Sequence, residues 1–278
     1  MSAFGNNVKT ALLLGGLTGL LVAVGAAMGQ QFIIPALVIA AIMNFGAWFF
    51  SDKIAIATMQ GQEVDAQSGG DLYRIVDELR RRAGLPMPRV FICPHDAPNA
   101  FATGRSPSHA SVAVTQGALN LLSRDELEGV LGHELAHVKN RDTLTSTVAA
   151  TVSGVLAMLA QWGFYLGGGR REGSNPLVAL VTVILAAVGA AVIKAAISRS
   201  REYVADADGS GIAGTPNGLI SALRKLDAYS QRIPLEQPNP AMNNLFIMEP
   251  MMGSSVMRLF ASHPPTEDRI AALERLRP

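Results

Sequence analysis

Cysteine and charge are both scarce in this chain. Cys93 is the only cysteine among 278 residues, so an internal disulfide is impossible and a disulfide-built scaffold is excluded. Cys93 lies in the apolar stretch RVFICP, and we expect a core residue there rather than a nucleophile. Charged residues make up only 16% of the chain, with a net charge of +1, against roughly 25% in a typical soluble domain. No overall field therefore directs the chain to nucleic acid or to an acidic partner.

Long apolar runs take the place of charge. Hydrophobic residues make up 49% of the chain. Uncharged runs of roughly 17–25 residues are typical of membrane helices, and four occur, at residues 10–29, 31–50, 144–166 and 176–193. The first could be a signal peptide, but it is too long for one and a second run follows at once, so we expect a retained anchor.

Two more polar segments separate and follow these runs. In the first, Asp71 could cap a helix with one apolar face, and RVFIC and ASVAVTQG are typical strands. Ser123 and Glu126 form a capping-box pattern that starts a second helix. The segment after the fourth run is mostly helical in pattern, with a long irregular stretch around residues 233–254.

Positive residues near the ends of membrane helices predict their orientation. Only Arg170 and Arg171 lie at the short loop 167–175 between the third and fourth runs. The other flanking cations lie together on the opposite side: Lys9, Lys53, Lys139, Arg141, Lys194, Arg199 and Arg201. This bias places both termini and both polar segments in the cytosol.

A metal-site motif, HELAH, begins at His133. His133 and His137 are four residues apart on an expected helix, so both imidazoles point the same way. Two imidazoles at this spacing suit zinc. Glu134 is offset around the helix and can reach a water activated by the metal. The alternative is a helix with two surface histidines.

A catalytic zinc site needs a third protein ligand and an open position for water. The segment SRSREYVADADG offers Glu202 as that ligand and Asp206, one turn further on, as the partner of a ligand histidine. The alternative is a charged helix end just outside a membrane, with Arg199 and Arg201 as anchors. The third and fourth runs form a hairpin, which returns Glu202 to the side on which His137 lies.

Seven residues separate His137 from Leu144 at the start of the third run. If one helix continues through Asn140–Asp142, the metal lies about 10 Å from the bilayer, at 1.5 Å per residue. We therefore expect substrates to be cut close to the membrane, on condition that this helix is unbroken.

Four stretches together resemble the HtpX family of membrane zinc metalloproteases, which is related to the CAAX prenyl proteases of the Ste24 type: NAFATGRSP, HELAH, SRSREYVADADG and SHPPTEDRI. The resemblance covers nearly the whole chain. It implies a zinc endopeptidase of the bacterial cytoplasmic (inner) membrane, with one Zn²⁺ per chain and its catalytic domain facing the cytosol. Its implied role is quality control of misfolded or damaged membrane proteins under stress. The family's third ligand matches Glu202 and its acidic partner residue matches Asp206.

Peptide hydrolysis at this site assigns Glu134 as the general base. His263 either donates to the oxyanion of the intermediate or caps the helix that starts at Thr266, and both alternatives stay open. Arg269 is expected to hold that helix in place. An extended substrate would add to a sheet edge, with these candidate residues: Asn99, Ala100, Phe101, Ala102 and Thr103.

We therefore predict a mainly α membrane protein with four hydrophobic helices and a cytosolic α+β zincin-type (gluzincin) metalloprotease domain. Residues 1–50 and 144–197 would form two membrane hairpins, and residues 51–143 and 198–278 the two parts of the catalytic domain. Polypeptides and the lipid bilayer are the expected partners, without nucleic acid. Two other functions remain open: a non-catalytic zinc-binding membrane scaffold, and a processing protease for lipidated C-termini, for which four spans are few.

Overall fold

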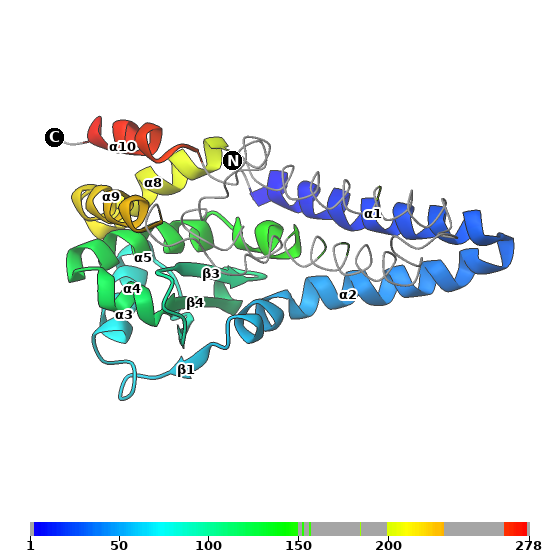
Figure 1. Ribbon diagram of the computed structural model, residues 1–278, viewed down its shortest axis with the longest axis horizontal. Helices are drawn as coiled ribbons and strands as arrows, with labels where there is room; N and C mark the ends of the chain where they lie inside the picture. The colour runs from blue at the N-terminus through cyan, green and yellow to red at the C-terminus, as the bar shows by residue number, and fades with distance from the viewer. Residues whose placement is uncertain are drawn as a thin grey trace, which may run out of the picture.

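A long helical hairpin projects from a compact α+β part (Figure 1). The computed structural model describes residues 3–149, 152, 156, 184, 199–230 and 264–276. Helix α1 (Ala3–Met28) leads away from the compact part, the 3-10 turn η1 (Gln30–Phe32) reverses the chain, and α2 (Ile33–Thr58) returns. Both ends of the hairpin therefore lie on the side of the compact part.

The hairpin carries an apolar surface. Helices α1 and α2 are long and apolar enough to cross a membrane, and they coincide with the first two expected spans. The other two expected spans fall outside the described residues, except for 144–149, 152, 156 and 184. Large side chains on α2 stay exposed, as expected of a surface that faces lipid: Ile34, Leu37, Ile42, Phe45 and Trp48.

Helix α2 continues past residue 50, where we placed the end of the hairpin. Its last turns reach the sheet, where Ile56 and Met59 form a buried cluster with Phe91 and Phe101. The division of the chain into four segments stays a prediction, but one unbroken helix links the hairpin to the sheet.

The sheet has four strands in the order β1-β2-β4-β3: β1 (Gln62–Val64), β2 (Arg89–Cys93), β3 (Ala100–Gly104) and β4 (Ala110–Thr115). Strands β2 and β4 run parallel, and the other two pairs are antiparallel. The expected strands RVFIC and ASVAVT are confirmed, whereas Gln116 and Gly117 already belong to α4 (Gln116–Leu121). Cys93 is fully buried in β2, which confirms it as a core residue.

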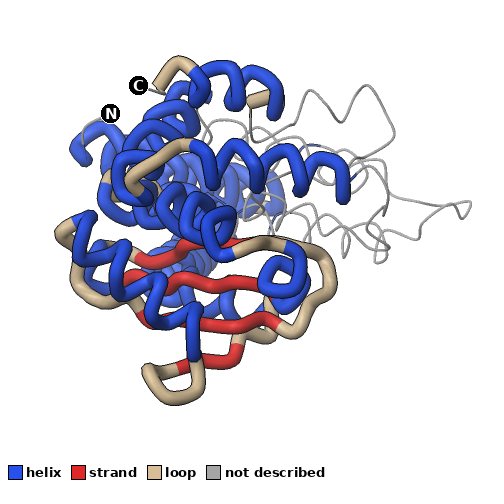
Figure 2. The backbone as a smooth tube through the Cα atoms, turned by 90° about the vertical axis from the view of Figure 1, so that its left-hand side faces the viewer, coloured by secondary structure: helices blue, strands red, loops and turns tan. Residues whose placement is uncertain are grey.

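Helices cover the face of the sheet opposite α2 (Figure 2). Helix α3 (Gly70–Ala83) buries Leu72, Ile75, Val76 and Leu79, the apolar face that the sequence predicts. Asp71 does not cap this helix, because the chain turns at Gly70 with φ +50° and the N-cap is Gly69. Asp71 lies in the first turn and pairs with Arg74.

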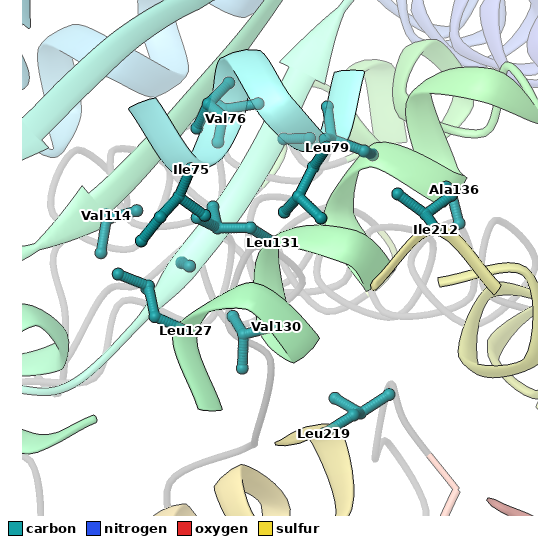
Figure 3. Close-up of a cluster of buried hydrophobic side chains, with 14 of the residues drawn as sticks. Ile75, Val76, Leu79, Val114, Leu127, Val130, Leu131, Ala136, Ile212 and Leu219 are labelled. Carbon is teal, nitrogen blue, oxygen red and sulfur yellow. The ribbon is translucent and has the colours of Figure 1, made fainter. Parts of the chain in front are cut away.

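Helix α5 (Arg124–Lys139) lies at the centre of the core (Figure 3). Leu131 and Leu135 are completely buried, and the predicted capping box of Ser123 and Glu126 is confirmed. Helices α8 (Arg199–Ala213) and α9 (Asn217–Ser230) pack against α5. Helix α10 (Thr266–Glu274) packs in turn against α8 and α9.

Helix α5 ends at Lys139, so the expectation of one helix continuing through Asn140–Asp142 is wrong. Arg141 takes a left-handed conformation with φ 58°. The N–H of Asp142 donates to the carbonyl of His137, and that of Arg141 to Val138, which closes the helix in a Schellman turn. Helical structure resumes over residues 143–149, where Ser146 donates to the carbonyl of Asp142. Asp142 can begin a new helix as its N-cap, which explains why the break falls here.

Candidate metal centre

Three side chains from two helices converge on one point. Nε2 of His133 and Nε2 of His137 lie 3.1 Å apart on α5. The carboxylate oxygens of Glu202, in the first turn of α8, lie 3.6 Å from the first of these nitrogens and 3.7 Å from the second. The three ligand atoms all lie within 4.8 Å of one another. The structure thus brings together the three metal ligands that the sequence proposes.

Two glycines allow α5 and α8 to approach closely beside these residues. A Cβ atom on Gly209 would lie 2.7 Å from both N and Cα of His133, and one on Gly132 would lie 2.7 Å from the carbonyl oxygen of Gly209. Gly209 lies seven residues after Glu202, on the same face of α8. The absence of side chains at this crossing therefore brings Glu202 within reach of the histidines.

A buried carboxylate lies behind His133. Oδ1 of Asp206 is 2.9 Å from Nδ1 of His133, and Arg269 of α10 donates to both Asp206 oxygens at 2.6 and 2.9 Å. Burial alone would raise the pKa of Asp206, but Arg269, with His133, holds that pKa at about 2. Arg269 does hold α10 in place, as expected, and it does so through the residue that we expected to partner a ligand histidine.

A second buried carboxylate lies behind His137, and the sequence analysis missed it. Nδ1 of His137 is hydrogen-bonded to Oδ2 of Asp142 at 3.3 Å, and Nε of Arg201 lies 3.4 Å from Oδ1 of the same residue. Arg201 is 5% exposed, so it is not the surface anchor that we considered as an alternative. The signal in the sequence was an acidic residue five positions after the second histidine, where a helix break would fold it back.

The centre has an excess of negative charge. Burial lowers the pKa of His137, but the nearby carboxylates of Glu202, Asp142 and Glu134 outweigh it and raise that pKa to about 9. A site that attracts a proton so strongly also attracts a cation. Two imidazole nitrogens and one carboxylate are the donor set of a catalytic zinc site with a position left for water, so the residues present fit zinc.

Glu134 lies beside the three ligands without belonging to them. Its Oε2 accepts a hydrogen bond of 2.8 Å from the backbone N–H of Ala102 in β3, and the residue is 6% exposed. Strand β3 is an edge strand of the sheet within the part of the chain that the structure describes. The general base that we proposed is therefore held against the strand edge that we proposed for the substrate.

The outer edge of β3 is set by its pairing with β4. Thr115 donates to the carbonyl of Asn99, and alternate residues of an antiparallel strand face the partner strand. Ala100, Ala102 and Gly104 therefore turn their backbone groups outward, and Thr143 already donates to the carbonyl of Gly104. All five candidate substrate-edge residues are buried in this structure: Asn99, Ala100, Phe101, Ala102 and Thr103.

Another carboxylate on α8, that of Asp208, lies two residues beyond Asp206 and accepts a hydrogen bond from Asn140 at 2.8 Å. His263 lies outside the described residues, as do the loop 167–175 and the stretch 233–254, so both roles considered for His263 stay predictions.

Comparisons with known proteins identify the family. The family model described as "Peptidase family M48" matches residues 66–277 of the chain. A protease HtpX homolog of Desulforapulum autotrophicum is 50% identical over 97% of this chain and 89% of its own length. One of Pyrococcus furiosus is 46% identical over 97% of this chain and 95% of its own length.

A solved structure shares the fold. The crystal structure of S. mikatae Ste24p matches with a TM-score of 0.50 at 17% identity, over 97% of this chain and 65% of that chain. The resemblance seen in the sequence is thereby confirmed, and the chain belongs to peptidase family M48, a family of metalloproteases, with HtpX homologues among its relatives.

Proposed function

We propose that this protein is a membrane-anchored zinc endopeptidase in which His133, His137 and Glu202 hold the metal. One observation carries the proposal: three converging ligand atoms lie beside Glu134, a carboxylate that binds the edge of a sheet. A purely structural zinc site has no need of such a carboxylate, because its coordination is closed by protein ligands alone.

Catalysis follows from these positions. Zinc, when bound, acts as a Lewis acid that lowers the pKa of a water ligand to about 7. Glu134 would accept the proton of the attacking water and pass it to the leaving amine of the peptide. Asp206 holds His133 through Nδ1, which leaves Nε2 for the metal. The low exposure of Glu134 and Glu202 strengthens every charge interaction in the site.

The substrate is an extended polypeptide that pairs with β3. The N–H and C=O of Ala100 and the C=O of Ala102 turn outward along this edge, and a peptide lying there as an added strand would pass Glu134. Because backbone groups make this pairing, the edge accepts many sequences, which suits an enzyme that removes damaged proteins.

The finer biological role rests on the family and on the hairpin. We infer that the enzyme degrades misfolded or damaged proteins of the bacterial cytoplasmic membrane, from a catalytic domain that faces the cytosol. The HtpX relatives, the exposed apolar hairpin and the cations flanking the expected spans support this role.

The position of the site relative to the bilayer supports substrates cut near the membrane. Phe49 lies beside Trp48 and Phe50 in an aromatic cluster on α2, and tryptophan is enriched at membrane interfaces. The guanidinium of Arg105 lies 4.7 Å from the centroid of the Phe49 ring. Arg105 lies three positions after Ala102, which contacts Glu134, and three steps of extended chain span about 10 Å at roughly 3.3 Å per residue. The distance of the metal from the bilayer is therefore inferred from Arg105 and β3, and no longer from an unbroken helix after α5.

Substitution of Glu134 tests the proposed function. The purified Glu134→Gln protein should retain zinc at the wild-type ratio and lose casein cleavage by at least about 100-fold, the effect typical of removing a general base. Metal analysis and proteolysis on the same sample measure both. Full cleavage by the variant would refute the mechanism, and wild-type protein that binds zinc but cleaves nothing would favour a scaffold instead.

A further inference from the structure

We propose that Asp142 is a positioning residue that orients His137 for the metal, so that each histidine ligand has its own buried carboxylate. The inference rests on the proposed function, because it takes His137 as a ligand. Asp142 lies outside both segments that supply the metal ligands. The break in the helix after α5 places it beside His137.

The hydrogen bond selects the correct nitrogen of His137. Nε2 faces Nε2 of His133 at 3.1 Å, and the opposite nitrogen, Nδ1, is bonded to Asp142 at 3.3 Å. A carboxylate on Nδ1 keeps the proton there and leaves the lone pair of Nε2 for the metal. The side chain of Asp142 is 4% exposed, so water competes little for this contact.

The backbone of the turn brings Asp142 into this place. Arg141 adopts φ 58°, a conformation that glycine takes without cost and that other residues take at about 1 kcal/mol. The turn folds the chain back, so that the N–H of Asp142 reaches the carbonyl of His137 at 2.9 Å. Asp142 thus binds both the backbone and the ring of His137.

The charges around Asp142 connect it to two other elements. Arg201, whose Nε is 3.4 Å from Oδ1 of Asp142, precedes the ligand Glu202 on α8. Lys9 of α1 interacts electrostatically with both Asp142 and Arg201. Asp142 therefore links the helix of His137 to the helix of Glu202, as Asp206 links His133 to α10 through Arg269.

A purely structural role can be separated from this one. Asp142 also begins the helical residues 143–149, since its carbonyl accepts the N–H of Ser146 at 3.2 Å. Asparagine caps a helix about as well as aspartate. Asp142→Asn therefore keeps the shape of the side chain and its ability to cap a helix, and removes the negative charge that faces Nδ1 of His137 and Nε of Arg201.

The test compares full-length Asp142→Asn with Asp208→Asn in detergent micelles. Asp208 is exposed on α8 and bonds to Asn140, which belongs to the same turn as Asp142, without contacting a ligand. Its substitution therefore makes the same change of charge close to Asp142. The zinc dissociation constant is measured on metal-free protein by competition with a chromophoric chelator. Asp142→Asn should raise it about 10–100-fold, with Asp208→Asn within about twofold of wild type. At saturating zinc, Asp142→Asn should lower kcat and leave KM unchanged.

The outcomes separate the two proposals. Wild-type zinc affinity in Asp142→Asn, or an equal loss in Asp208→Asn, would overturn the positioning role and leave the proposed function intact. Failure of the wild-type protein to bind zinc would overturn both. If Asp142→Asn does not fold, Asp142→Ser, which is smaller and also caps a helix, replaces it in the same assay.

Discussion

At the scale of single residues, burial decides what the ionisable groups do. Asp206 and Arg269 are both about 1% exposed, and each is tolerated in the core because the other compensates its charge. A buried pair of this kind is worth little beyond a well-packed apolar pair, but loss of one partner costs about 3–5 kcal/mol. The pair serves here to orient a side chain, because the two hydrogen bonds from Arg269 fix the carboxylate of Asp206 beside Nδ1 of His133.

Glu126 shows the same principle at the start of α5 and gives a prediction for pH. Burial would raise its pKa, but hydrogen bonds from Lys225, the backbone of Ser123 and Ser221 hold that pKa at about 2, below the ordinary 4.5. The ionised form therefore stabilises the fold above pH 4.5, and this contribution is lost as pH falls through about 2. Glu126→Gln should destabilise the protein at pH 7 by about 1–3 kcal/mol.

Thermal unfolding across pH 2–8 measures the effect. The difference in midpoint between Glu126→Gln and wild type should be constant above about pH 5 and should narrow towards pH 2. Asp125→Asn, an exposed change one residue away, is the control and should have little effect. A difference that stays constant down to pH 2 contradicts the assignment.

At the scale of elements, the crossing of α5 and α8 forms the metal centre. Gly209→Ala would place a methyl group 2.7 Å from the backbone of His133, so α8 must move away and take Glu202 with it. We expect a loss of about 1–3 kcal/mol in stability together with weaker zinc binding.

Gly211→Ala is the matched control for this crossing. It makes the same substitution on the same helix where a Cβ meets nothing within 4 Å. Alanine should there raise stability by about 0.5–1 kcal/mol through helix propensity. Thermal unfolding and chelator competition on both variants test the pair, and equal effects would show that the close approach is unimportant.

At the scale of the whole molecule, α2 joins the hairpin to the sheet without a flexible linker. Its last turns pack against Phe91 and Phe101 on one face of the sheet, while α3 and α5 cover the other. The site is therefore held in a fixed position relative to the aromatic cluster on α2, because Ala102 beside Glu134 lies three positions before Arg105, about 10 Å along an extended chain.

This arrangement predicts a preference for cleavage near the membrane. A cleavable sequence placed a few residues from a membrane span should be cut faster than the same sequence in a soluble reporter, with the enzyme in a bilayer. Tethering raises the effective concentration of substrate at the site, so an increase of about 100-fold is expected. Glu134→Gln gives the background. Equal rates for the two reporters would contradict the predicted height.

The sequence by itself determined several features that depend on short spacing. The four-residue interval of His133 and His137, the capping box of Ser123 and Glu126, the apolar face of α3 and the strands β2 and β4 all follow from helical or strand periods. The segment SRSREYVADADG offered Glu202 and Asp206, the family resemblance matched both, and the structure brings both to the histidines.

Only the tertiary structure decided the contacts between distant segments. The burial of Arg201 and the hydrogen bond from Ala102 to Glu134 join parts of the chain with no common period. The break at Arg141, which brings Asp142 to His137, is local, but no helical or strand period marks it. A helix capped by Asp142 and a helix running on through it are both locally acceptable. The choice between them depends on Arg201, which reaches the carboxylate of Asp142 only once α5 and α8 have packed together.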